Sequence, residues 1–201
     1  MRVLRPASEA EVVATFLRGE LQSERWGDTI RELLREDSVD EVLLAHPDVG
    51  DAEANAYRAR VLDRHRGWLQ RIGLFEGLPR ELDWSLVALT PDEVLAIRYI
   101  NWDWWIEISD GTRDPCVAAD RIRRGLVPGA NLDEDRALAE RLRSHVPPPE
   151  LIAIAPPDLS KLVVLEGHVR LTAYALFPDV LPAELEVFVG TGEHVERWSE
   201  F

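Results

Sequence analysis

The sequence predicts an α+β protein, in which a helical N-terminal region, residues 1–80, packs on a small mixed-sheet domain, residues 81–201. Apolar residues recur at helical spacing through the first 80 positions, and strand-like apolar runs appear only after them. A run of helices followed by strands with helices between them is typical of the α+β class. With 201 residues, of which 46% are hydrophobic, the chain is long enough to bury a sizeable core.

The N-terminal region contains several helix signals. Ser8 and Glu11 have the spacing of a capping box ahead of an apolar stripe, and Gly73 suits the position after the end of the longest helical pattern. These signals predict helices over residues 8–21, 29–35, 38–46 and 51–72.

After residue 80 the pattern changes to short apolar runs separated by helices. Strands are predicted over residues 84–89, 151–154, 162–165 and 184–189. Helices are predicted over residues 90–106, 115–125, 134–145 and 168–177, and three prolines at 147–149 predict a stiff connector. The helix that starts at Pro91 is ambiguous in its last third, since residues 102–108 also alternate with the period of a strand.

The composition and net charge argue against several classes of protein. The formal net charge of −14 and the sequence pI near 4.8 disfavour broad contact with DNA, RNA or anionic lipid, which needs clustered positive charge. Cys116 is the only cysteine, and no apolar run reaches the ~20 residues of a membrane span. These features predict a cytoplasmic protein without a membrane partner. An acidic surface is also compatible with a homo-oligomer or a protein partner.

The first candidate site is a turn between a predicted strand and a predicted helix. The apolar run 162–165 stops at Glu166, Gly167 and His168, and Arg170 follows in the first helical turn. Helix N-termini bind anions because their first N–H groups lack partners and the macrodipole adds positive charge. The turn would therefore cradle a phosphate or a carboxylate. The alternative is an ordinary turn with Glu166 as a helix cap and Arg170 on the surface.

The second candidate is the loop before the predicted helix 115–125. Arg113 in a glycine-containing loop can hold a phosphate with two parallel hydrogen bonds, and Thr112 lies beside it. The alternative is a capped loop with an exposed arginine.

The third candidate contains three tryptophans within four residues, Trp102, Trp104 and Trp105. Such a cluster would form an aromatic wall for a flat ligand. Asp103 and Glu107 lie one helical turn apart and would hold Mg²⁺ or act as a base. The alternative is core packing, with Trp102 and Trp105 largely buried and both acids in solvent.

The stretch from residue 162 to 189 resembles the ParB/sulfiredoxin superfamily, in a bacterial branch. In that superfamily a strand leads into a Gly-His-Arg type of turn, then a helix and another strand. The likeness is carried by Glu166, Gly167, His168, Arg170, Leu171 and Ala173, followed by the strand 185–189.

A second likeness lies upstream, where the superfamily has an arginine ahead of a helix that ends in Ile-x-x-Gly. The corresponding residues are Arg113, Ala119, Ile122 and Gly125. The resemblance implies that Arg113 and the turn bind the phosphates of a nucleotide. A sulfiredoxin has a reactive cysteine where this chain has Gly167, and the chain lacks the basic helices with which ParB proteins bind DNA.

Together these observations and the resemblance predict a nucleotide-binding protein, with ATP-dependent phosphotransfer to a small metabolite as its candidate activity. ATP or another nucleoside triphosphate with Mg²⁺ is the expected cofactor. Glu166 and His168 are the expected catalytic residues, and Asp103 and Glu107 are the reserve acids or metal ligands. The phosphates are assigned to Thr112, Arg113, Gly167, His168 and Arg170. The alternative is a non-catalytic module that senses a ligand or binds a protein.

Overall fold

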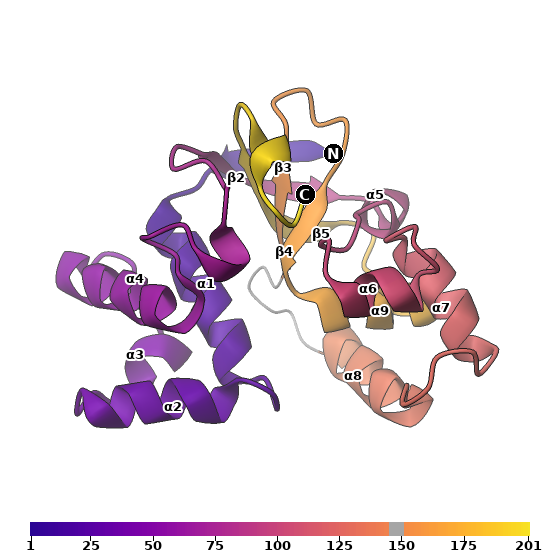
Figure 1. The fold of residues 1–201 in the computed structure, drawn as a ribbon, viewed down its shortest axis with the longest axis horizontal. Coiled ribbons are helices and arrows are strands. Elements are labelled where there is room, and N and C mark those ends of the chain that lie inside the picture. Colours follow the sequence, from indigo (N-terminus) through magenta and orange to yellow (C-terminus); the bar gives the residue numbers. More distant parts are fainter. Residues whose placement is uncertain (145–150) are drawn as a thin grey trace.

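A mixed β-sheet lies between two groups of helices and forms the centre of the molecule (Figure 1). The computed structural model describes residues 1–144 and 151–201 and confirms the predicted α+β class. The predicted connector at residues 147–149 lies outside the described residues.

The sheet of the described residues has five strands in the order β1-β2-β5-β3-β4. All neighbours are antiparallel except β5 and β3. The strands are β1 (Arg2–Pro6), β2 (Asp83–Leu89), β3 (Leu151–Ala155), β4 (Val163–Glu166) and β5 (Leu185–Thr191). The four predicted strands are confirmed. The expectation that only helices precede residue 80 is wrong, because β1 pairs with β2 at the edge of the sheet.

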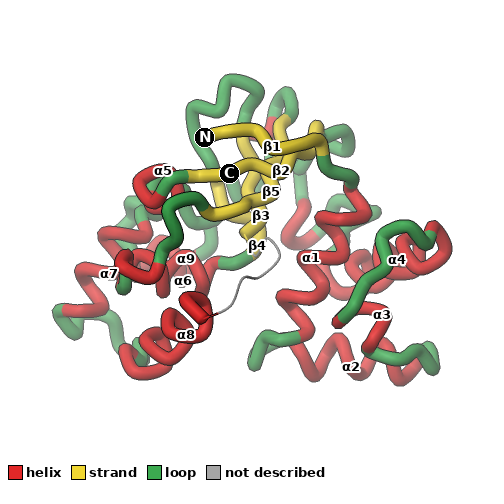
Figure 2. Tube along the Cα trace, turned by 180° about the vertical axis from the view of Figure 1, so that it is seen from behind, coloured by secondary structure: helices red, strands yellow, loops and turns green. Residues whose placement is uncertain are grey.

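Both faces of the sheet are buried, which explains why the inner strands read as continuous apolar runs. Trp84 and Leu86 of β2 pack with the N-terminal helices, whereas Val87 and Leu89 pack with the C-terminal ones. Successive side chains of a strand point to opposite faces, so each of the strands β2 to β5 contributes to two cores. All five residues of β3 are buried. Figure 2 shows the two helical groups on either side of the strands.

The N-terminal helical group covers one face of the sheet. It consists of α1 (Glu9–Leu21), α2 (Gly27–Glu36), α3 (Val42–Ala45) and α4 (Ala52–Arg66), followed by a short 3₁₀ turn, η1 (Gly73–Phe75). The predicted capping box of Ser8 and Glu11 is confirmed. The longest predicted helix ends six residues early, at Arg66, because Gly67 already takes the left-handed conformation that ends a helix, with φ of 85°.

The C-terminal helical group covers the other face. It consists of α5 (Pro91–Leu95), α6 (Asp103–Ile108), α7 (Pro115–Arg123), α8 (Leu132–Ser144) and α9 (His168–Leu176). Two further 3₁₀ turns follow, η2 (Pro178–Val180) and η3 (Val195–Arg197). No helix in the described part of the chain combines the length and the apolar character that crossing a membrane would require.

The continuous helix predicted over residues 90–106 is wrong, since the structure has two short helices there. The backbone between them makes tertiary hydrogen bonds instead of helical ones. The N–H of Arg98 donates to the carbonyl of Leu162, and the carbonyl of Arg98 accepts from the N–H of Val164, both at 2.8 Å. Pairing with the edge of β4 thus overrides local helix propensity.

Close packing in the sheet gives a first prediction. Gly190 in β5 lies opposite Trp84, and an added Cβ would come within 2.7 Å of the indole ring. We expect Gly190→Ala to lower the free energy of unfolding by about 1–3 kcal/mol, because it overpacks a filled core. Urea denaturation measures this. Gly50→Ala, in an exposed loop beside the side chain of Asp48, is the control and should change stability little; an equal loss in both variants would contradict the packing argument.

Candidate functional site

The β4–α9 turn has the strand-turn-helix geometry that the sequence predicts. Gly167 has φ of 102° and is the N-cap of α9, so no side chain caps this helix. Glu166 is therefore not the cap, and its Oε1 accepts a hydrogen bond from Arg170 Nη2 at 2.9 Å. Both side chains are only 16% exposed. The guanidinium that was expected to hold a phosphate is paired with the carboxylate of the same turn.

The turn is covered by α1 of the N-terminal helical group. A Cβ on Gly19 would lie 2.7 Å from Glu166 Oε1 and 3.1 Å from Arg170 Nη2. The missing side chain at Gly19 therefore lets the ion pair approach the helix backbone. This contact joins the two helical groups at the end of an edge strand.

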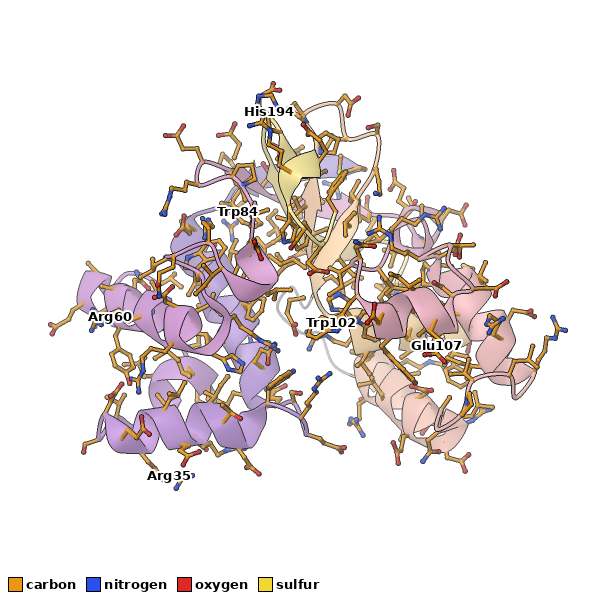
Figure 3. All side chains as sticks on the ribbon, in the orientation of Figure 1. Arg35, Arg60, Trp84, Trp102, Glu107 and His194 are labelled. Carbon is orange, nitrogen blue, oxygen red and sulfur yellow. The ribbon has the colours of Figure 1, made fainter. Side chains whose placement is uncertain are left out.

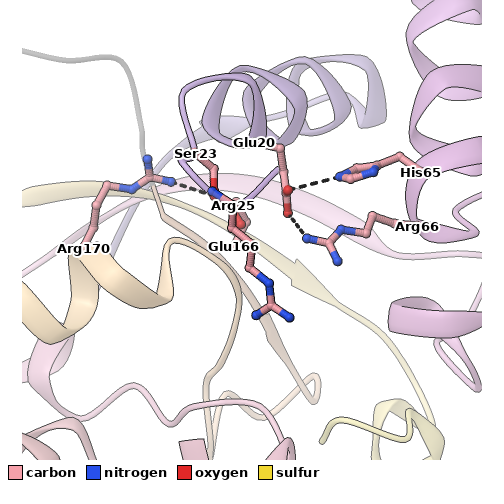
Figure 4. A network of polar contacts seen from close by, with 7 residues as sticks. All are labelled: Glu20, Ser23, Arg25, His65, Arg66, Glu166 and Arg170. Atoms are coloured by element: carbon pink, nitrogen blue, oxygen red, sulfur yellow. Dashed lines mark hydrogen bonds and ion pairs between the residues drawn. The ribbon is translucent and has the colours of Figure 1, made fainter. Parts of the chain in front are cut away.

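A second set of ion pairs lies beside the first (Figure 4). Glu20 is 4% exposed, and its carboxylate accepts from Arg66 Nη2 at 2.5 Å and lies 3.1 Å from His65 Nε2. We call Glu20, His65, Arg66, Glu166 and Arg170 the interlobe junction. It brings the carboxylate of Glu20 on α1 close enough to that of Glu166, at the end of β4, for the two charges to interact.

Burial shifts the pKa values of two side chains in the β4–α9 turn. It raises the pKa of Glu166 to about 7, and the charge of Glu20 adds to this effect, while Arg170 opposes it. Burial lowers the pKa of His168 to about 3, helped by the positive charges of Arg170 and Arg66. His168 is therefore neutral at physiological pH, which removes it as a cationic phosphate ligand. Glu166 is at the midpoint of its titration near pH 7.

The imidazole of His168 belongs to an aromatic stack. Its ring lies 5.0 Å from that of Trp105, which in turn lies 4.7 Å from that of Tyr99. His168 Nε2 has no solvent contact and no hydrogen-bond partner among the described residues. The stack links the turn to α6.

The loop before α7 is engaged with the C-terminal segment. Arg113 donates from Nη1 to the main-chain oxygen of Glu200 at 3.2 Å and from Nη2 to that of Phe201 at 2.8 Å. Thr112 Oγ1 donates to the carbonyl of Ser109 at 2.6 Å, and Asp114 caps α7. In this conformation Thr112 and Arg113 stabilise their own loop and the segment at residues 200–201.

The tryptophan cluster is more exposed than core packing requires. Trp102 and Trp104 are 40% and 46% exposed, so the expectation that Trp102 is largely buried is wrong. Trp102 lies between the two helical groups, whereas Glu107 points away from that space (Figure 3). Asp103 and Glu107 line different cavities, Asp103 with Trp102 and Glu107 with Trp104. Within residues 1–144 and 151–201, no three His, Cys, Asp or Glu side chains are grouped to hold a metal ion.

A cleft of about 580 Å³ opens between the N-terminal helical group and α6. Its walls come from the end of α4, the start of η1, the segment before α6 and the C-terminal segment. The lining residues are Asp63, Arg64, His65, Arg66, Gly67, Ile72, Gly73, Leu74, Asn101, Trp102, Asp103 and Glu200. Of the residues predicted for a site, Asp103 lines this cleft, beside Trp102 of the tryptophan cluster.

Cations and aromatic rings alternate beside the cleft. The guanidinium of Arg25 lies 4.6 Å from the ring of Trp26 and 5.7 Å from that of Trp102. The guanidinium of Arg66 also lies close to Trp26, 3.9 Å from its ring. Arg25 is exposed and makes no ion pair with any residue in the described ranges. No local motif distinguishes Arg25 and Arg66 from surface arginines, so the sequence does not predict them at a site.

Comparison with known proteins adds no family assignment. No protein-family model matches the chain, and no significant match is found among the curated proteins or the solved structures.

The raised pKa of Glu166 gives a second prediction. The unfolded carboxyl titrates near ~4.3, so the stability that protonated Glu166 contributes is complete below that pH and is lost as pH rises through about 7. Glu166→Gln replaces the carboxyl group by an amide that does not titrate, so the variant does not lose this stability as pH rises. We expect the variant's free energy of unfolding, relative to the wild type, to increase between pH 5 and pH 8 by on the order of 3 kcal/mol.

The measurement is urea denaturation of both proteins at several pH values. His168, whose lowered pKa makes the fold less stable as pH falls below ~6.5, is present in both proteins, so its effect cancels in the difference. Glu193→Gln, at an exposed position, is the control. A difference that stays constant with pH would contradict the buried, uncharged form of Glu166.

Proposed function

We propose that this protein binds a small phosphate-bearing molecule with a flat ring, of which a nucleotide is the first candidate, in the cleft between its helical groups. The observation that carries the proposal is Trp102, a 40% exposed indole on the wall of the cleft, with the guanidinium of Arg25 5.7 Å from its ring. An exposed aromatic face beside a guanidinium that has no carboxylate partner in the described part of the chain suits a ring that bears an anion.

The dimensions and chemistry of the cleft support this proposal. Ligand sites of small molecules occupy ~300–1,000 Å³ and combine apolar walls with a few polar groups. Here Ile72, Leu74 and Trp102 supply the apolar surface, and Arg66, whose guanidinium is paired with Glu20, also lines the cleft. We assign the ring to Trp102 and the phosphates to Arg25.

The turn that resembles the nucleotide cradle has a supporting role in this proposal. Glu166 and Arg170 pair with each other, and His168 is neutral within an aromatic stack. These residues contact both α1 and α6 and so fix the two helices relative to each other. The proposed ligand lies beside them in the cleft. Mg²⁺ would arrive with the triphosphate.

A second candidate function is transfer of a phosphoryl group to a small metabolite. It is favoured by Asp103, a carboxylate that lines the cleft and would accept a proton from a hydroxyl acceptor. A product assay with nucleotide and a panel of hydroxylated metabolites separates this candidate from simple ligand sensing.

The third prediction tests the binding site. We expect calorimetric titration with nucleoside triphosphates and Mg²⁺ to show binding to the wild type. Arg25→Ala should weaken binding roughly ten- to hundred-fold, because a hydrogen bond to a charged group contributes ~1.5–3 kcal/mol. Trp102→Ala should have an effect of similar size, because stacking of a base on an aromatic ring contributes ~1–3 kcal/mol.

Two matched variants serve as controls for this experiment. Arg35→Ala changes an exposed arginine on α2 away from the cleft (Figure 3), and Trp104→Ala changes a tryptophan that is 46% exposed and does not line the cleft. Both should bind as the wild type does. Titrations without heat for every nucleotide, or equal losses in the variants and their controls, would reject the proposal.

A further inference from the structure

Trp26 lies in a series of rings and guanidinium groups that reaches from α4 to the wall of the cleft. The guanidinium of Arg66, at the end of α4, lies 3.9 Å from the Trp26 ring, and that of Arg25 lies 4.6 Å from the same ring. Arg25 also lies 5.7 Å from the ring of Trp102, which lines the cleft. All three distances are within the ~6 Å at which a cation is attracted to an aromatic face. Trp26 does not itself line the cleft, so its effect on a ligand there must pass through a neighbour.

Contacts with α4 fix the half-buried indole of Trp26 in place. The ring of His65 packs edge-on against it, with 5.5 Å between the ring centroids. His65 Nε2 lies 3.1 Å from the buried carboxylate of Glu20, and Arg66 Nη2 donates to the same carboxylate at 2.5 Å (Figure 4). The two groups that contact Trp26 from α4 are therefore themselves anchored to α1, and together they give the indole a rigid support.

Arg25 comes from a turn with an ordered backbone but has an exposed side chain. Its N–H donates to Ser23 Oγ at 3.3 Å, and the N–H of Gly27 donates to the carbonyl of Ser23 at 2.8 Å. An exposed arginine side chain loses rotamer freedom when it binds an anion, and this loss weakens binding. The contact with Trp26 restricts the guanidinium before a ligand arrives, so less freedom remains to be lost.

We infer that Trp26 is a positioning residue for the ligand site, whose indole holds the guanidinium of Arg25 beside Trp102. The inference rests on the proposed function and deepens it by naming a residue outside the cleft on which affinity depends. In this arrangement Trp102 stacks on the ring of the ligand and Arg25 binds its anionic end. Trp26 sets the distance between these two groups without touching the ligand.

The test is calorimetric titration of Trp26→Phe and Trp26→Leu with ATP and Mg²⁺. Phenylalanine keeps an aromatic face for the guanidinium, whereas leucine keeps apolar bulk without such a face. We expect Trp26→Phe to bind within about twofold of the wild type. Trp26→Leu should bind about three- to tenfold more weakly, the range expected for immobilising one long side chain on binding. Trp104→Leu changes a tryptophan that does not line the cleft, and as the control it should bind as the wild type does.

A double-mutant cycle separates positioning from a general effect on the fold. If Trp26 acts through Arg25, then Trp26→Leu should not weaken binding further in the Arg25→Ala background, whereas a general effect would add to that of Arg25→Ala. If Trp26→Leu is too unstable to titrate, Trp26→Met takes its place in both comparisons. Equal affinities of the phenylalanine and leucine variants, or additive losses in the cycle, would overturn the inference and leave the proposed function standing. Failure of the wild type to bind ATP or any other nucleotide would overturn the proposed function together with the inference.

Discussion

The approach of Glu166 to the backbone of α1 at Gly19 is the contact on which the relation between the two helical groups depends. The groups cover opposite faces of one sheet, and beyond its edge they also meet where Arg25 contacts Trp102 and where Trp105 packs against both cores. Because β4 is an edge strand, the turn at its end lies where both groups can meet. Burying the carboxylate costs free energy, as its raised pKa shows. The junction therefore serves to place the elements rather than to stabilise the fold.

The same turn also positions the aromatic wall of the cleft. His168 stacks on Trp105 of α6, and Tyr99 Oη shares a hydrogen bond of 2.6 Å with Thr172 of α9. α6 has only six residues, so its own backbone hydrogen bonds stabilise it weakly. Its first turn, with Trp102 at the N-cap, is held through these contacts with α9. The residues that resemble a phosphate cradle thus act on the cleft through the ring stack.

The sequence predicts those parts of the fold in which local pattern and tertiary packing agree. The strands from β2 to β5 are apolar runs because both faces are buried, and the capping box at Ser8 is a local signal. β1 was missed because an exposed edge strand of five residues has no apolar pattern. The break after α5 was missed because Arg98 bonds to residues more than sixty positions away. The cleft was missed for the same reason, since Arg66, Trp102 and Glu200 come from three distant segments.

Net charge bears on how such a cleft would recognise an anion. A chain with a formal charge of −14 repels a nucleotide at long range, so electrostatic steering would not favour encounter. Salt screens this repulsion beyond ~8–10 Å at physiological ionic strength, whereas contacts inside a partly enclosed cleft are screened much less. Arg25 would therefore act on a bound anion only at short range. Affinity in this protein would depend on a few desolvated contacts, and its association rate would rise rather than fall when salt is added.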